Sequence, residues 1–236
     1  MAVRKKVWLP IVGGVVVIVL AATGWFGWQH YRDRSFTDQF PVDQAKLSAT
    51  GRSAYFVLEP GYQLTYAAGT EQVMDTVLDQ TQQIDGVTTR VFEKREMKGG
   101  ELTEVKRDYL AIDPGTGDVY FFGEDIDEYE GDKVVGHEGA WRSGVGAARF
   151  GLLLPGAPRV GQKHAQEIAP GAAMDQSEVV STTESVQVPA GAFAGAMAVD
   201  ETTPLEPMAT VRKYYAPGIG MVKEDELVLV KYGRAG

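Results

Sequence analysis

The chain has 236 residues, of which 44% are hydrophobic and 23% charged, the ordinary balance of a globular protein. It contains no cysteine, which excludes disulfides, thiolate zinc sites and cysteine nucleophiles. The first 34 residues carry a net charge of +4, so the total of −9 leaves −13 on the remainder. Nucleic acid repels such an acidic remainder, and we expect no nucleic-acid partner.

Residues 7–28 form a stretch of 22 residues without a charge. As a helix it would be roughly 33 Å long, against a hydrocarbon core of roughly 30 Å. Trp8 lies near one end and Trp25 and Trp28 near the other, as in the aromatic belts of membrane spans. We therefore expect residues 1–34 to be a membrane anchor with one transmembrane helix, and the lipid bilayer to be the partner of residues 7–28.

A cleavable signal peptide is the alternative, since Arg4, Lys5 and Lys6 precede the apolar run and Ala21 and Ala22 follow its centre. The length of the run and the aromatic residues after these alanines favour an uncleaved anchor. The three basic residues favour a cytoplasmic N-terminus. This orientation predicts a single-pass protein whose C-terminal domain is extracytoplasmic, in the periplasm or at the cell surface.

The remainder is predicted to be a linker over 35–52 and an antiparallel β domain over 53–236. Turn signals recur every 8 to 15 residues, among them Asp85-Gly86 and Gly99-Gly100. The runs between the turns are rich in β-branched and aromatic residues. Strands are expected over 62–67, 72–84, 87–97, 102–112, 119–122, 163–168, 177–188, 194–203, 209–215 and 221–232. The predicted fold is mainly β, with one curved antiparallel sheet forming a half-barrel or open barrel.

A glycine-rich, apolar segment over 136–161 interrupts this pattern. It is expected to fold over the open side of the sheet with Trp141 as a plug. Trp141, Phe150 and Leu153 are therefore the candidates for contacting an apolar ligand. The alternative is an ordered loop that seals the core.

The acidic run after Phe122 supplies the candidates for a metal site, Asp125, Asp127 and Glu130. Carboxylates at alternating positions resemble part of a calcium loop, but Tyr129 stands where an oxygen ligand is needed. A solvated turn is the favoured interpretation, and neither a metal nor a cofactor is expected.

No catalytic motif is complete. His137 lacks the second histidine of the zinc-protease helix, and Ser143 lacks the glycine two positions before it that a nucleophile elbow needs. His164 is 27 residues away from His137. We therefore do not expect an enzyme.

Three segments carry a family resemblance. The runs 186–193 (VQVPAGAF) and 213–222 (KYYAPGIGMV) each place a strand before a turn, and 120–125 (YFFGED) leads through Trp141 to the turn at Pro170-Gly171. Over roughly 55–232 the chain resembles uncharacterised exported bacterial β-proteins, a group that is itself similar to the lipoprotein-carrier type of half-barrel. The resemblance implies an open concave apolar face and carries over no catalytic residue.

The expected function is that of a membrane-anchored envelope protein whose non-enzymatic β domain binds a lipid or another apolar ligand. The alternatives are a structural or protein-interaction domain with an envelope partner and, third, a hydrolase.

Overall fold

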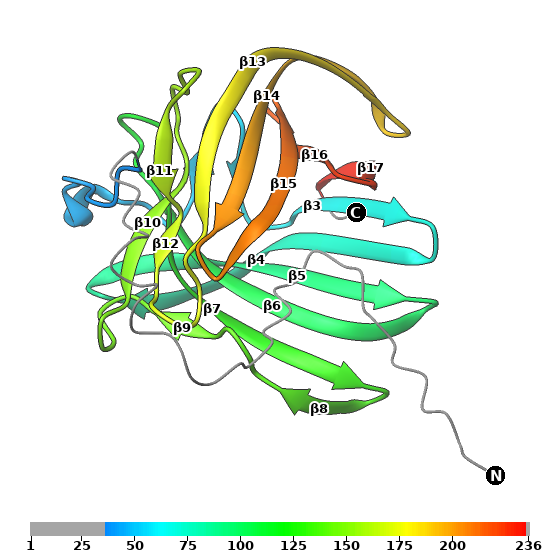
Figure 1. The fold of residues 1–236 in the computed structure, drawn as a ribbon, viewed down its shortest axis with the longest axis horizontal. Coiled ribbons are helices and arrows are strands. Elements are labelled where there is room, and N and C mark those ends of the chain that lie inside the picture. The colour runs from blue at the N-terminus through cyan, green and yellow to red at the C-terminus, as the bar shows by residue number, and fades with distance from the viewer. Residues whose placement is uncertain (1–35, 235–236) are drawn as a thin grey trace.

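The computed structural model describes residues 36–234. The expected anchor at 7–28 lies outside these residues. Within residues 36–234, no helix has both the length and the apolar character needed to cross a membrane. This part of the chain is mainly β and antiparallel, as the turn pattern predicts (Figure 1).

The strands, with one short 3-10 helix, follow one another in this order: η1 (Gln44–Lys46), β1 (Gly51–Arg52), β2 (Val57–Leu58), β3 (Tyr62–Ala68), β4 (Glu71–Ile84), β5 (Val87–Lys98), β6 (Glu101–Ile112), β7 (Val119–Glu130), β8 (Lys133–Gly136), β9 (Trp141–Arg142), β10 (Arg149–Leu154), β11 (Lys163–Ala165), β12 (Glu167–Ile168), β13 (Gln176–Val188), β14 (Gly191–Thr203), β15 (Glu206–Ala216), β16 (Gly220–Glu224) and β17 (Leu227–Arg234).

Fifteen of the strands belong to one sheet, in the order β11-β13-β14-β15-β16-β17-β3-β4-β5-β6-β7-β10-β12, with β8 and β9 also paired to β7. Strands β1 and β2 pair with each other apart from it. Within residues 36–234 the strand pairings do not close a barrel. The two ends of the sheet, β11 and β12, are nevertheless consecutive in the chain, with only Gln166 between them.

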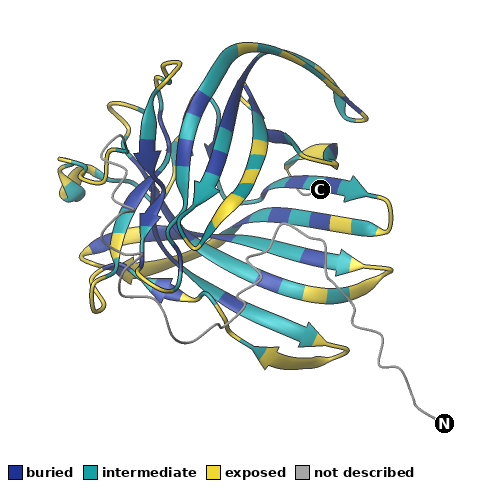
Figure 2. Ribbon diagram, viewed as in Figure 1, coloured by how far each residue is buried: buried dark blue, intermediate teal, exposed yellow. Residues whose placement is uncertain are grey.

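The sheet bends so that its two halves face one another. Strands β13, β14 and β15 run across the fan of β4 to β7 (Figure 1). Side chains from both halves, such as Phe92 of β5 and Tyr215 of β15, belong to one buried cluster. The inner surface of the bent sheet therefore holds the main core. Figure 2 shows buried and partly exposed positions alternating along these strands, as the period of two requires.

The two expected two-residue hairpins are confirmed. Asp85 and Gly86 connect β4 to β5 with φ angles of 50° and 79°, and Gly99 and Gly100 connect β5 to β6 with 62° and 88°. A left-handed pair at both central positions matches the twist of the flanking strands.

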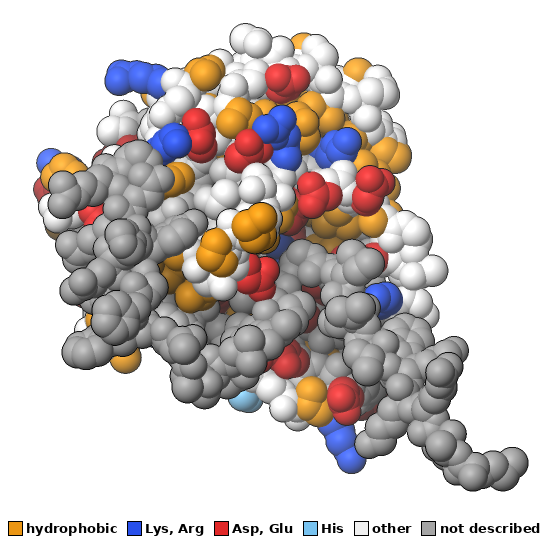
Figure 3. Space-filling model, in the orientation of Figure 1, with side chains coloured by type: hydrophobic (Ala, Val, Ile, Leu, Met, Phe, Trp, Pro, Cys, Tyr) orange, Lys and Arg blue, Asp and Glu red, His pale blue; other side chains and the backbone are white. Residues whose placement is uncertain are grey.

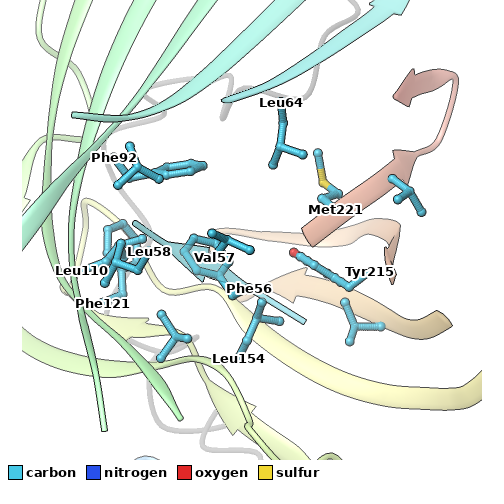
Figure 4. Packing of buried hydrophobic residues seen from close by; sticks show 14 of the residues in the cluster. Phe56, Val57, Leu58, Leu64, Phe92, Leu110, Phe121, Leu154, Tyr215 and Met221 are labelled. Carbon is cyan, nitrogen blue, oxygen red and sulfur yellow. The ribbon is translucent and has the colours of Figure 1, made fainter. Parts of the chain in front are cut away.

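The apolar part of the interior is filled by the chain itself. Phe56, Val57 and Leu58 lie between the side of the sheet that carries Phe92 and the side that carries Tyr215 (Figure 4). All three are buried, and Leu58 has no exposed surface. Residues 56–58, which we call the plug, therefore fill the apolar space between these two sides of the sheet.

A second cluster lies on the outer face of β5, β6, β7 and β10, around Phe122 and Tyr120. The described part of the expected linker packs on it, with Phe40 against Tyr120 at 6.2 Å between ring centroids. Single bridges join Thr37 to His164 and Ser48 to Ile112.

Two sequence-based expectations differ from the structure. The acidic run after Phe122 is not a turn, since β7 continues through it to Glu130. The segment 136–161 is not a separate cover, because its residues 141–142 and 149–154 form β9 and β10 and pair with β7. In both cases pairing with neighbouring strands overrides the local composition.

Candidate binding site in the charged interior

The inner face of the fan carries ionisable side chains. Asp75 of β4 pairs with Lys94 of β5, which pairs with Lys106 of β6, so the three side chains share a face. The next row across the strands consists of Phe92, Asp108 and Glu124. Phe92 belongs to the main core, so this face is the inner one. On the other side of the row that contains Lys94 and Lys106, Glu96 of β5 pairs with Glu104 of β6.

The opposite half of the sheet adds a second charged group. Lys213 of β15 pairs with Glu224 of β16, and its Nζ is 3.9 Å from Oε1 of that glutamate. The same Nζ is 2.5 Å from Oε2 of Glu201 on β14. The other oxygen of Glu201 accepts a hydrogen bond from Nε2 of Gln166 at 2.9 Å. Gln166 is the residue between β11 and β12, so the junction of the sheet ends lies at this site.

Two more carboxylates come from the turn beyond that junction. The backbone N–H of Asp175 donates to Oε1 of Glu167 at 2.6 Å. Burial raises the pKa of Glu167, and the charges of Asp175 and Glu124 raise it further. Burial also raises the pKa of Asp175, followed by the charge of Glu201.

The two halves act on each other electrostatically. Burial opposes ionisation of Glu224, yet Lys213 beside it and Lys94 from the facing strands hold its pKa below the usual value. The pKa of Asp175 stays raised by burial, and Lys213 and then Lys106 partly offset that increase. Groups from β4, β5, β6, β7, β12, β14, β15, β16 and the turn at Asp175 therefore form one cluster, which we call the charged interior.

Burial changes the protonation of its carboxylates. It raises the pKa of Asp75 to about 7, although Lys94 beside it acts in the opposite direction. Burial, and then the charge of Asp108, hold the pKa of Glu124 well above the usual range. Burial is also the main reason why the pKa values of Asp108 and Glu96 are raised. Desolvation penalises the charged form of each acid.

The charged interior contains many more acids than bases. Its nine carboxylates belong to Asp75, Glu96, Glu104, Asp108, Glu124, Glu167, Asp175, Glu201 and Glu224. Its three bases are Lys94, Lys106 and Lys213. Among the described residues, no cationic side chain comes within 4 Å of six of these carboxylates, all except Glu104, Glu201 and Glu224.

Solvent still reaches this cluster. The side chains of Lys106, Glu104 and Lys213 keep 18%, 19% and 20% of their surface exposed. These three side chains therefore combine partial exposure with surroundings that desolvate the carboxylates beside them.

The three residues predicted to contact an apolar ligand are not brought together. Trp141 is buried at the charged interior, where its Nε1 donates to Oε1 of Glu124 at 3.2 Å and its ring packs on Phe121. Phe150 lies on the outer face, stacked on Phe122 at 4.8 Å between centroids. Leu153 packs against the main core and is partly buried.

The three candidate metal ligands lie on the outer side of β7 or at its end. Asp125 is 2.6 Å from Nη2 of Arg142, and Asp127 is 2.8 Å from Nη1 of Arg107. Glu130 is exposed. Among residues 36–234, no group of three or more His, Cys, Asp or Glu side chains is arranged to hold a metal ion.

The histidines lie apart from the charged interior. His137 is exposed, with Nδ1 2.7 Å from the carbonyl oxygen of Ile126. His164 is buried, and burial lowers its pKa to about 4. It borders a cavity of about 540 Å³ between residues 37–46 and the outer face, together with Asp118 and Tyr120. No residue of the charged interior lines this cavity.

Most of the site was missed from the sequence. The alternation along 102–110 was visible, but one of its two faces carries Lys106 and Asp108 and the other carries Arg107. Hydropathy therefore could not tell which face is inner. The one available signal was the pairing of acids and bases at a spacing of two in β5 and β6.

Comparison of the chain with protein-family models, with curated proteins and with solved structures gives no match.

Proposed function

We propose that this protein is a membrane-anchored, non-enzymatic binding protein of the cell envelope, and that its ligand occupies the charged interior. The anchor is residues 7–28, and the bent sheet is an open half-barrel of the lipoprotein-carrier kind. The observation that carries the proposal is the set of six carboxylates without a cationic partner, on an inner surface that solvent reaches.

Such an arrangement opposes folding. Carboxylates taken from water without a partner destabilise the folded state or must bind protons. A chain of this size can fill its interior with apolar side chains, as residues 56–58 do at the other end. The retention of charged groups on one part of the inner surface is therefore explained by a ligand.

The ligand proposed for this site is more polar than the lipid or other apolar ligand that the sequence predicts. The plug at residues 56–58 occupies the apolar end of the interior. The charged interior itself offers carboxylates, three ammonium groups and a minority of apolar side chains such as Ile126. The ligand must accordingly be polar or carry charged groups.

The structural or protein-interaction alternative requires a distinctive outer surface. On the face shown in Figure 3, acidic and basic side chains are interspersed. Arg212 and Asp200 form an exposed, doubly hydrogen-bonded pair between β14 and β15. A surface of mixed sign favours solubility over one acidic docking face.

The binding part of the proposal is tested on the full chain in phosphatidylcholine nanodiscs. Replacing Trp8, Trp25 and Trp28 by Phe leaves Trp141 as the only tryptophan. We expect at least one of spermidine, dodecanoate and dodecyl maltoside (below its micelle concentration) to change the emission of Trp141 saturably. Asp75→Asn should weaken that response, whereas Asp79→Asn, on the same strand but with a side chain 90% exposed, should not. A spectrum that none of the three probes changes would contradict the proposal.

The anchor is tested separately by extracting membranes with alkaline carbonate. The full chain should stay in the pellet, and a chain lacking residues 1–34 should appear in the supernatant. Mass spectrometry of the mature protein should show residues 7–28 intact. Loss of the first 22 or so residues would replace the anchor by a signal peptide.

A further inference from the structure

We infer that the ligand of the charged interior is an aliphatic polyamine, bound with its ammonium groups against carboxylates of facing strands. This inference rests on the proposed function and specifies the ligand class of the same site. Its basis is the charge balance of the interior, the buried Asp75 oxygen that lacks both a hydrogen-bond donor and a cation within 4 Å, and the spacing of the carboxylates over several strands.

Two buried carboxylate oxygens of the charged interior have no hydrogen-bond partner; Oε1 of Glu104 lies 3.4 Å from Nζ of Lys106, and the other belongs to Asp75. This residue is 4% exposed, and its Oδ1 has no hydrogen-bond partner. It lies on the inner face of β4 between Val73 and Val77, which both belong to the main core. A buried carboxylate oxygen without a donor is rare in folded proteins and calls for a missing partner. An ammonium group supplies up to three donors and the opposite charge.

Charged and titratable groups surround Asp75 on every side. Lys94 and Glu96 face it from β5, Asp108 from β6, Glu224 from β16 and Tyr66 from β3. Three of these five are acids and one is a base. Among the described residues, no carboxylate lies within 4 Å of Nζ of Lys94, so this lysine does not neutralise Asp75 by direct contact. The local field therefore favours an additional cation.

The spread of the carboxylates distinguishes an organic polycation from a metal ion. The six carboxylates without a cationic partner come from β4, β5, β6, β7, β12 and the turn at Asp175. Among residues 36–234, no three of the potential ligands converge on a point. A metal ion needs ligands within one small sphere, whereas a linear polyamine places its charges several bonds apart.

Apolar side chains separate the charged ones. Val73, Phe92, Ile126 and Met221 are buried on or beside the same inner surface. Methylene groups between the amines can contact these side chains while the amines contact the acids. Tyr215 is buried there as well. A simple inorganic cation would leave this apolar surface unused.

Binding of such a cation should displace protons. The raised pKa of Asp75, about 7, means that this acid is partly protonated at neutral pH. An ammonium group beside it favours the ionised form, so the proton leaves as the ligand enters. The ionised fraction of an acid with this pKa rises by roughly eightfold between pH 6.0 and 7.5, and the affinity should rise with it.

The experiment is calorimetric titration of the full chain, in phosphatidylcholine nanodiscs, with spermidine at pH 7.5. Empty nanodiscs are the blank. The titration is run in two buffers of different ionisation enthalpy. We expect saturable binding. The measured binding enthalpy should differ between the two buffers in the direction that net release of protons to the buffer produces. Affinity should fall by roughly eightfold at pH 6.0.

The variants separate the interior from the acidic outer surface. Asp75→Asn should weaken spermidine binding by roughly tenfold and reduce the number of protons released. Glu124→Gln, on β7 of the same half of the sheet, should also weaken binding. Asp79→Asn makes the same change of charge on the same strand and should leave the affinity unchanged, because its side chain is 90% exposed. Circular dichroism establishes that each variant is folded.

Equal weakening by Asp75→Asn and Asp79→Asn would overturn the inference, since it would mean binding to the acidic surface as a whole. A second outcome would also overturn the inference: spermidine does not bind, but dodecanoate or dodecyl maltoside does, and that binding depends on Asp75. In that case the proposed binding function would stand. If none of the three probes binds, both fall.

Discussion

The indole of Trp141 donates a hydrogen bond from Nε1 to Oε1 of Glu124 at 3.2 Å. Trp141 is the only tryptophan among residues 36–234. It is held in place by an edge-to-face contact with Phe121 at 5.2 Å between centroids. Because Glu124 belongs to the charged interior, the emission of this tryptophan reports on the protonation of the site.

The first prediction uses this contact. Burial and the charge of Asp108 raise the pKa of Glu124, so its titration should appear above the usual range of glutamate, near 4.3. With Trp141 as the only tryptophan, its emission should change with a midpoint well above that value. Glu124→Gln should abolish the change, whereas Asp125→Asn, the next residue on the outer face, should preserve it. A midpoint at the ordinary glutamate value would contradict the burial of this carboxylate.

The second prediction concerns the plug. Phe56 is 7% exposed and packs on Phe92 at 5.5 Å between centroids. Phe56→Ala removes a large apolar side chain from the centre of the main core and should lower the free energy of unfolding by about 3–5 kcal/mol. Urea denaturation followed by circular dichroism measures the loss. Met208→Ala is the control, since Met208 is 97% exposed and its truncation should change the stability by no more than about 0.5 kcal/mol. A small effect of Phe56→Ala would mean that residues 56–58 do not hold the interior together.

Local sequence signals predicted the hairpins of the fan closely. The expected strands at 72–84 and 87–97 differ from β4 and β5 by one residue at an end, because Asp-Gly and Gly-Gly turns fix where those strands stop. The strand expected at 221–232 is divided into β16 and β17. Its turn is formed by Asp225, with φ of 46°, and Glu226, and neither glycine nor proline marks it.

The charged interior was less accessible to prediction. Asp75 and Glu224 are almost 150 positions apart in the sequence and meet only because the sheet bends. The composition of the acidic run after Phe122 is that of a turn, and it predicts a solvated segment. Its alternate members face opposite sides of β7, so that Glu124 enters the interior and Asp125 binds Arg142 outside. The composition of a segment does not say which of its neighbours will cover it.

The third prediction concerns the junction of the two sheet ends. A Cβ on Gly151 of β10 would overlap the carbonyl oxygen of Gln166 and lie 2.7 Å from that of Ala165. Gly151→Ala should therefore lower the free energy of unfolding by about 1–3 kcal/mol through overpacking. The change in the urea midpoint measures it. Gly115→Ala is the control, since its nearest contact is the flexible side chain of Asp113 at 3.2 Å. Equal midpoints for the two variants would argue against the close crossing of β10 and the β11–β12 segment.

The fourth prediction concerns stability and pH. Burial raises the pKa of Asp75 from its usual value near 4 to about 7, so between these values the folded chain binds more protons here than the unfolded chain. The contribution of Asp75 to stability is therefore lost progressively as pH rises from about 4 to above 7. Asn in this position cannot ionise. The free energy of unfolding of Asp75→Asn relative to the wild type should accordingly increase between pH 5 and pH 8, by an amount on the order of 2–4 kcal/mol.

Urea denaturation at pH 5 and pH 8 measures this difference without spermidine, and thus independently of any ligand. Asp79→Asn, whose side chain is 90% exposed, is the control for the loss of one carboxylate from the same strand. The sign is decisive. If Lys94 instead stabilised the ionised Asp75 as an ordinary ion pair, the free energy of unfolding of Asp75→Asn relative to the wild type would decrease as the pH rises. That outcome would remove the main reason to regard Asp75 as a carboxylate that lacks its cation.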